Sequence, residues 1–214
     1  MRPLLFAVLA SLAVAGCGTA SPASESSGER ADAATSPEEG SPVEDAPPIT
    51  TSPNAWGPTY CAAAGEPGFA VGDQIGDLPV KDCDTGATVS IEEACGAKAT
   101  WIFAAHTHCP TCRATADFTA EVAASVADQN VAVLHIVHDD SGISCPTWRE
   151  RYKLAGLPNV KIYADPSGAA WSALKTSNYT APSAFLDARR VITYKAHGLT
   201  QSGIQSKIKD ALAR

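Results

Sequence analysis

Two cysteines separated by two residues carry the strongest chemical signal in the sequence. Cys109 and Cys112 stand in the stretch Thr-His-Cys-Pro-Thr-Cys, residues 107–112. A thiolate attacks a disulfide, and a second thiol nearby resolves the mixed disulfide that forms. A structural zinc site would need a second Cys-x-x-Cys or a histidine pair at ligand spacing, and the sequence has neither. An inert disulfide is the other alternative, but this spacing between a strand and a helix favours a redox-active pair.

The segments on either side predict the elements that hold this pair. The apolar run Ala99–Ala105 predicts a buried strand, and residues 113–128 predict a helix. Pro110 suits the first helical position, where a missing N–H costs no hydrogen bond. Cys109 is then the N-cap, beside unpaired amides that favour its thiolate, and Cys112 lies one turn inside. One face of the predicted helix carries Phe118, Val122 and Val126.

Residues 1–17 have the features of an export signal. A basic start is followed by about twelve apolar residues, too few to span a bilayer, and then by small residues. The ending Val14-Ala15-Gly16-Cys17 resembles the bacterial lipobox, in which the cysteine is lipid-modified and becomes the first mature residue. This resemblance implies an envelope lipoprotein anchored through Cys17, and Gly18 at the following position favours the outer membrane.

Residues 18–56 differ in composition from the rest of the chain. Ser, Ala, Pro, Glu and Gly dominate, so the segment cannot bury enough apolar surface to fold, and we expect a disordered tether. Its net charge of −6 accounts for most of the −7 of the whole chain. The acidic balance therefore belongs to the tether and says nothing about the substrate. The acidic residues of this segment are Glu25, Glu29, Asp32, Glu38, Glu39, Glu44 and Asp45.

Residues 57–214 suffice for one domain with a sizeable core. Strands alternate with helices, which predicts an α/β fold: a central mixed sheet flanked by helices, with an N-terminal β-hairpin extension. Besides 99–105, we expect strands at 70–80, 87–91, 131–137, 160–163, 183–186 and 191–196. Besides 113–128, we expect helical segments at 92–97, 146–154 and 168–174, and a closing helix with Ile204, Ile208 and Leu212 on its apolar face.

The order of these motifs resembles the thioredoxin superfamily over residues 70–212. The Cys-x-x-Cys pair is followed by Thr-Ala-Pro-Ser-Ala-Phe-Leu-Asp at 180–187, by Arg-Val-Ile-Thr-Tyr at 190–194 and by His197-Gly198 before the last helix. The pattern is most similar to envelope thiol–disulfide oxidoreductases of the TlpA/ResA type, which border on the peroxiredoxin-like group. The resemblance implies that Pro182 is the cis-proline facing the active-site disulfide and that Ala181 and Pro182 bind the substrate backbone.

Two departures from that family concern the proton chemistry of the site. His108 replaces the usual Trp before the first cysteine, and it is a candidate for stabilising the Cys109 thiolate and contacting substrate. The family's buried acid on the preceding strand is absent from 101–103, Trp-Ile-Phe. His106 and His108 together with the two cysteines also offer N and S ligands to Cu(I), so a copper-handling protein stays open as an alternative. A peroxiredoxin-like peroxidase is another, although the Thr-Pro-x-x-Cys peroxide motif is absent around Cys109.

The remaining cysteines fit an oxidising compartment. Cys61, Cys83, Cys95 and Cys145 are even in number, and three pairings are open to them. Closing the short loop from Cys83 to Cys95 is geometrically easy, which leaves Cys61 for Cys145 by default; alternatively, Cys145 is a free buried thiol.

These observations together predict a lipid-anchored thiol–disulfide oxidoreductase. Cys109 attacks, Cys112 resolves, and the partners are protein disulfides or dithiols and an envelope redox donor or acceptor. We expect a monomer with no cofactor, no bound metal and no nucleic-acid partner.

Overall fold

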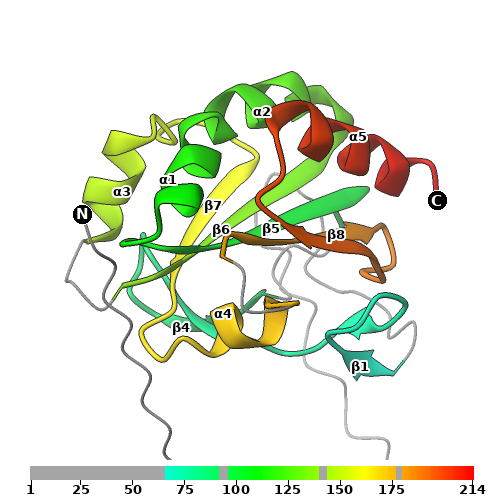
Figure 1. Ribbon diagram of the computed structural model, residues 1–214, viewed down its shortest axis with the longest axis horizontal. Coiled ribbons are helices and arrows are strands. Elements are labelled where there is room, and N and C mark those ends of the chain that lie inside the picture. Colours follow the sequence, from blue (N-terminus) through cyan, green and yellow to red (C-terminus); the bar gives the residue numbers. More distant parts are fainter. Residues whose placement is uncertain (1–65, 92–95, 140–143, 177–179) are drawn as a thin grey trace, which may run out of the picture. The chain divides into compact units, whose positions relative to one another are not determined.

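A computed structural model describes residues 66–91, 96–139, 144–176 and 180–214 (Figure 1). Contacts divide the chain into the units Met1–Asp45 and Ala46–Arg214, and every described residue belongs to the second. The predicted signal peptide and tether lie outside the described residues, as do Cys61 and Cys95. Among the described helices, none combines the length and apolar character needed to cross a bilayer.

A seven-stranded mixed sheet forms the centre of the described unit, in the order β4-β3-β7-β6-β5-β8-β9. Strands β5, β6 and β7 run parallel, and the strands on both sides of them pair antiparallel. The strands are β3 Pro79–Asp82, β4 Thr88–Ser90, β5 Ala99–His106, β6 Val131–His138, β7 Val160–Ala164, β8 Pro182–Asp187 and β9 Ile192–His197. This arrangement confirms the predicted thioredoxin-like fold, including the antiparallel β3–β4 pair at its N-terminal end.

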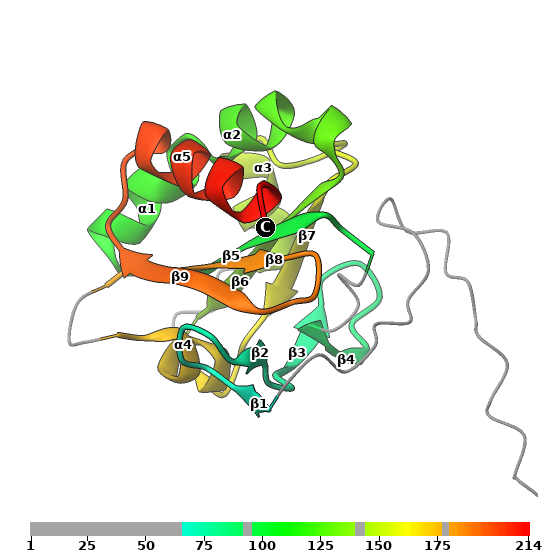
Figure 2. The same cartoon turned by 90° about the vertical axis from the view of Figure 1, so that its right-hand side faces the viewer.

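Helices cover both faces of this sheet (Figures 1 and 2). One face carries α1, α2, α3 and α5, and the other carries α4 and the short parallel pair β1–β2. The bounds are β1 Pro67–Gly68, β2 Gln74–Ile75, α1 Pro110–Asp117, α2 Thr119–Ser125, α3 Cys145–Arg151, α4 Ala169–Leu174 and α5 Gln201–Leu212, with a 3₁₀ turn at Ala127–Gln129.

Alternation along the central strands explains why both faces are covered. In β5 the side chains of Trp101 and Phe103 enter the core beneath α1, α3 and α5, whereas Ile102 and Ala104 enter the core on the α4 side. A strand whose side chains are apolar on both faces is typical of the buried centre of a parallel sheet. The run 99–105 therefore predicts β5 correctly, and the strand extends one residue further, to His106.

Two predicted elements are interrupted in the structure. The expected strand 70–80 is divided into β2 and β3. The expected helix 113–128 is divided at Phe118, where α1 ends and α2 begins. There Thr119 donates its hydroxyl to the Thr115 carbonyl at 3.1 Å, and such side-chain bonds to the preceding turn commonly bend helices. The predicted helical turn at 92–97 lies mostly outside the described residues.

Candidate active site

Cys109 and Cys112 form a disulfide at the junction of β5 and α1, with their Cα atoms 5.1 Å apart. Cys109 occupies the N-cap of α1 with extended backbone angles, and Pro110 begins the helix, as their order in the sequence predicts. The Cys112 amide donates to Cys109 Sγ at 3.0 Å. This sulfur therefore faces an amide at the positive end of the helix, where a thiolate is stabilised.

The two cysteines differ in exposure. Cys109 keeps 7% of its surface accessible, and Cys112 keeps 0%. Pro110 and Thr111, the residues between them, are exposed. A molecule approaching from solvent therefore reaches Cys109 before Cys112.

The segment before β8 lies beside this pair. Ala181 is 1% exposed and belongs to the same buried cluster as both cysteines. Its carbonyl accepts the Gly198 N–H at 3.3 Å, and a Cβ added at Gly198 would lie 3.6 Å from Thr111 Cγ2. The predicted docking residues Ala181 and Pro182 and the loop before α5 therefore both border the Cys-Pro-Thr-Cys turn.

The expected cis bond before Pro182 is wrong. The described residues contain no cis peptide bond, and Ala181 instead has a φ of 60°. A left-handed residue at this point lets the chain turn into β8 with a trans bond.

Histidines surround the redox turn on the β5 and β6 side. His108 is exposed, and His106 at the end of β5 is half-buried. The His106 ring lies 5.1 Å from that of His138, at the end of β6, and 5.7 Å from that of Trp171 in α4. Within the described ranges no three His, Cys, Asp or Glu side chains are grouped to hold a metal ion.

The AhpC/TSA family matches residues 71–195, which is more than half of the chain. The chain belongs to the AhpC/TSA family. The predicted enzyme class, a thiol–disulfide oxidoreductase, agrees with this family. A comparison with curated proteins finds no significant match.

Two solved structures have a fold similar to that of this AhpC/TSA protein. Mycobacterium tuberculosis DsbF, in mixed oxidized and reduced forms, is 20% identical with a TM-score of 0.52, covering 63% of this chain and 94% of its own. The thioredoxin domain of a thiol-disulfide oxidoreductase from Bacteroides vulgatus is 14% identical with a TM-score of 0.54, covering 66% and 96%.

The AhpC/TSA protein contains a buried histidine that was not among the site residues predicted from the sequence. His135 in β6 is 0% exposed, and burial lowers its pKa to about 3. Its Nδ1 accepts from Trp148 Nε1 at 3.1 Å, so Nε2 carries the proton and faces Thr119 Oγ1 at 3.4 Å. Thr119 in turn donates to the α1 carbonyl of Thr115. This chain of hydrogen bonds connects α3, β6 and the α1–α2 junction.

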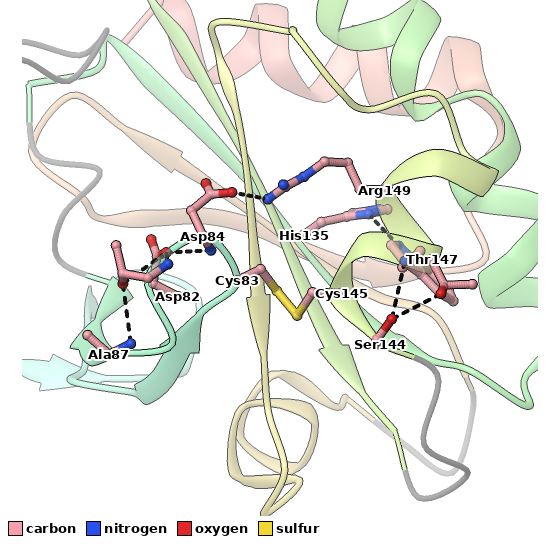
Figure 3. Close-up of a disulfide and its surroundings, with 11 residues drawn as sticks. Asp82, Cys83, Asp84, Ala87, His135, Ser144, Cys145, Thr147 and Arg149 are labelled. Atoms are coloured by element: carbon pink, nitrogen blue, oxygen red, sulfur yellow. Dashed lines mark hydrogen bonds and ion pairs between the residues drawn. A yellow bond between two sulfur atoms is a disulfide. The ribbon is translucent and has the colours of Figure 1, made fainter.

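The predicted pairing of Cys83 with Cys95 is wrong, because Cys83 is bonded to Cys145 (Figure 3). The reason is the non-local pairing of β3 with β7. The Cys83 amide donates to Ile162 in β7 at 3.1 Å, and α3, whose first residue is Cys145, packs on the same strand. The same bond also excludes the predicted pairing of Cys61 with Cys145.

Proposed function

We propose that this protein exchanges disulfides with exported client proteins through Cys109 and Cys112. The single observation that carries the proposal is the asymmetry of the pair. Cys109 Sγ accepts the Cys112 N–H at the N-terminus of α1, and Cys109 is the more accessible residue, whereas Cys112 is fully buried. A nucleophile needs the first environment, and a resolving thiol needs the second.

The exchange proceeds in two steps. In the reducing direction the Cys109 thiolate attacks a client disulfide, forms a mixed disulfide and releases one client thiolate, which takes up a proton. The Cys112 thiol then loses its proton and attacks Cys109 Sγ. This releases the second client thiolate and leaves Cys109 and Cys112 oxidised, so two electrons have passed to the client. The oxidising direction is the reverse.

Client docking is proposed at the residues bordering Cys109. Ala181 and Pro182 lie at the start of β8, and the exposed residue His108 directly precedes Cys109 in the chain. A client segment lying along 181–182 would bring its disulfide to Cys109 while Cys112 stays covered.

Insulin reduction in the presence of dithiothreitol tests the proposal. The oxidoreductase should accelerate insulin precipitation, and Cys109→Ser should abolish the acceleration. Equilibration in thiol–disulfide buffers then gives the direction: a potential near about −270 mV indicates a reductant, and one near about −120 mV an oxidant. No acceleration by the wild type, at any ratio of enzyme to insulin, would refute the exchange reaction.

The family match favours a second candidate, a peroxiredoxin-like peroxidase. In that reaction the Cys109 thiolate attacks a peroxide and becomes a sulfenic acid as the O–O bond breaks and an alcohol or water leaves. Cys112 then condenses with the sulfenic acid and water is lost. Peroxide consumption faster than insulin reduction, with a sulfenic acid trapped by dimedone in Cys112→Ser, would support this candidate over disulfide exchange.

Anchorage in the envelope is part of the proposal. Residues 1–17 would direct export, Cys17 would carry the lipid, residues 18–56 would act as the tether and residues 57–214 would form the catalytic domain. Labelled palmitate should be incorporated into the wild type but not into Cys17→Ala, and membrane fractionation tests the predicted outer-membrane location. Equal labelling of both forms would contradict lipidation at Cys17.

A further inference from the structure

The segment entering the redox turn makes two hydrogen bonds to His106. The His106 carbonyl accepts the Cys109 N–H at 3.0 Å, and His106 Nδ1 accepts the His108 N–H at 3.3 Å. The intervening Thr107 is held separately, by its amide to the His138 carbonyl at 3.2 Å and by its hydroxyl to Asp139 at 2.7 Å. The His106 side chain therefore holds the Thr107–His108 peptide, and its carbonyl holds the next peptide, which carries the Cys109 N–H.

The orientation of the His106 ring is set by two other elements. His138 of β6 and Trp171 of α4 each lie edge-to-face with it, at 5.1 and 5.7 Å between ring centres. His138 is itself anchored, because its Nδ1 bonds the Asp165 carbonyl at 2.7 Å. Since Nδ1 of His106 accepts a backbone N–H, its neutral ring carries the proton on Nε2.

We propose that His106 is a positioning residue for the exchange reaction, acting through Nδ1 as the acceptor that fixes the Thr107–His108 peptide, next to the peptide that carries the Cys109 N–H. The Cys109 sulfur is stabilised as a thiolate only if it points at the Cys112 amide, 3.0 Å away. A looser peptide before Cys109 lets this sulfur leave the amide, and the thiol pKa of Cys109 then rises. The inference rests on the proposed function, but its effect is on the sulfur itself and is measured without a client.

Three variants at this position separate the acceptor from the ring. His106→Asn places an amide oxygen where Nδ1 stands, so it keeps the acceptor and loses the ring. His106→Phe keeps the ring and loses the acceptor. His106→Gln carries its amide one bond further out, near the Nε2 position, and is a second loss variant should Phe impair folding. His138→Phe is the matched control for imidazole charge, because it keeps an aromatic ring against His106, which holds the orientation of that ring, and leaves the His108 N–H with its acceptor.

The measurement is the pH dependence of iodoacetamide alkylation of Cys109 in the reduced protein, with thermal midpoints recorded in parallel. His106→Phe and His106→Gln should raise the Cys109 pKa by about half a unit, the size expected of one neutral hydrogen bond acting through a loop. His106→Asn and His138→Phe should stay within about 0.2 unit of wild type.

Three outcomes would overturn the inference. An unchanged pKa in both loss variants would show that the acceptor does not position Cys109. A rise in His106→Asn equal to that in His106→Phe would assign the effect to ring packing. Equal rises in His106→Phe and His138→Phe would assign it to imidazole charge. Failure of the proposed function appears elsewhere, as a wild type that does not reduce insulin, and leaves these pKa differences measurable.

Discussion

The buried histidine His135 makes a quantitative prediction about acid stability. Its ring is 0% exposed in β6, and burial lowers its pKa to about 3, against 6.5 for a free side chain. It is held neutral between Trp148, which donates to Nδ1, and Thr119, whose hydroxyl faces Nε2. Folding therefore excludes a proton that the unfolded chain accepts.

The sign and size of the effect follow from these two pKa values. Below pH 6.5 the unfolded state binds a proton at this site and the folded state does not, so stability is lost as pH falls from 6.5 towards 3. At pH 5 the loss from His135 alone is about 2 kcal/mol relative to pH 8. The pKa of Asp82 lies below its ordinary value: burial raises it, but backbone hydrogen bonds from Thr85 and Asp84 and the charge of Lys161 lower it on balance.

Urea unfolding of the oxidised protein, followed by tryptophan fluorescence at pH 8, 6 and 5, tests this prediction with the variant His135→Gln. At pH 8 the variant should be less stable by roughly 1–3 kcal/mol if the Trp148 indole loses its acceptor. Between pH 8 and 5 the wild type should lose about 2 kcal/mol more than the variant. His108→Gln, which changes an exposed ring, is the control and should follow the wild type. Parallel curves for wild type and His135→Gln would refute the reasoning.

Three further predictions concern the second disulfide, the loop beside the redox turn and the tether. Replacing Cys83 and Cys145 by Ser should lower the free energy of unfolding in urea by about 4 kcal/mol, because their bond closes a sequence separation of 62; a loss below 1 kcal/mol would contradict this. Gly198→Ala, at a φ of 61°, should cost about 1 kcal/mol, measured in the same way, with Gly203→Ala in α5 as the control. Deleting residues 18–54 should leave the rate of insulin reduction within about twofold, and a collapse of that rate would show that the tether is part of the site.

Local patterns predicted the redox turn well because its determinants are adjacent in sequence. The apolar run 99–105, the cysteine spacing and Pro110 suffice to define a strand, an N-cap and the first turn of a helix. The division of the following helix at Phe118 was not predicted. It involves the Thr119 hydroxyl and a histidine on another strand, and helical periodicity carries no information about either.

Long-range pairing is what the sequence could not supply. Cys83 meets Cys145 because β3 lies beside β7, and this arrangement has no signature in the spacing of the cysteines. His135 stands in an apolar run that predicts a buried strand. Its position there was the one feature of the sequence that indicated a neutral, hydrogen-bonded ring, because a buried polar group needs a partner. Its partner Trp148 comes from α3, which only the fold brings to it.

The division of labour between Cys109 and Cys112 is the central claim, and trapping of client complexes tests it most directly. Reduced Cys112→Ser and Cys109→Ser proteins are mixed with a disulfide-bonded client, quenched with acid and separated under non-reducing conditions. Cys112→Ser should accumulate a covalent mixed disulfide, because the more accessible Cys109 still attacks and nothing resolves the product. Cys109→Ser should give no complex, because the remaining sulfur is 0% exposed. Complexes formed equally by both variants, or by Cys109→Ser alone, would contradict the account.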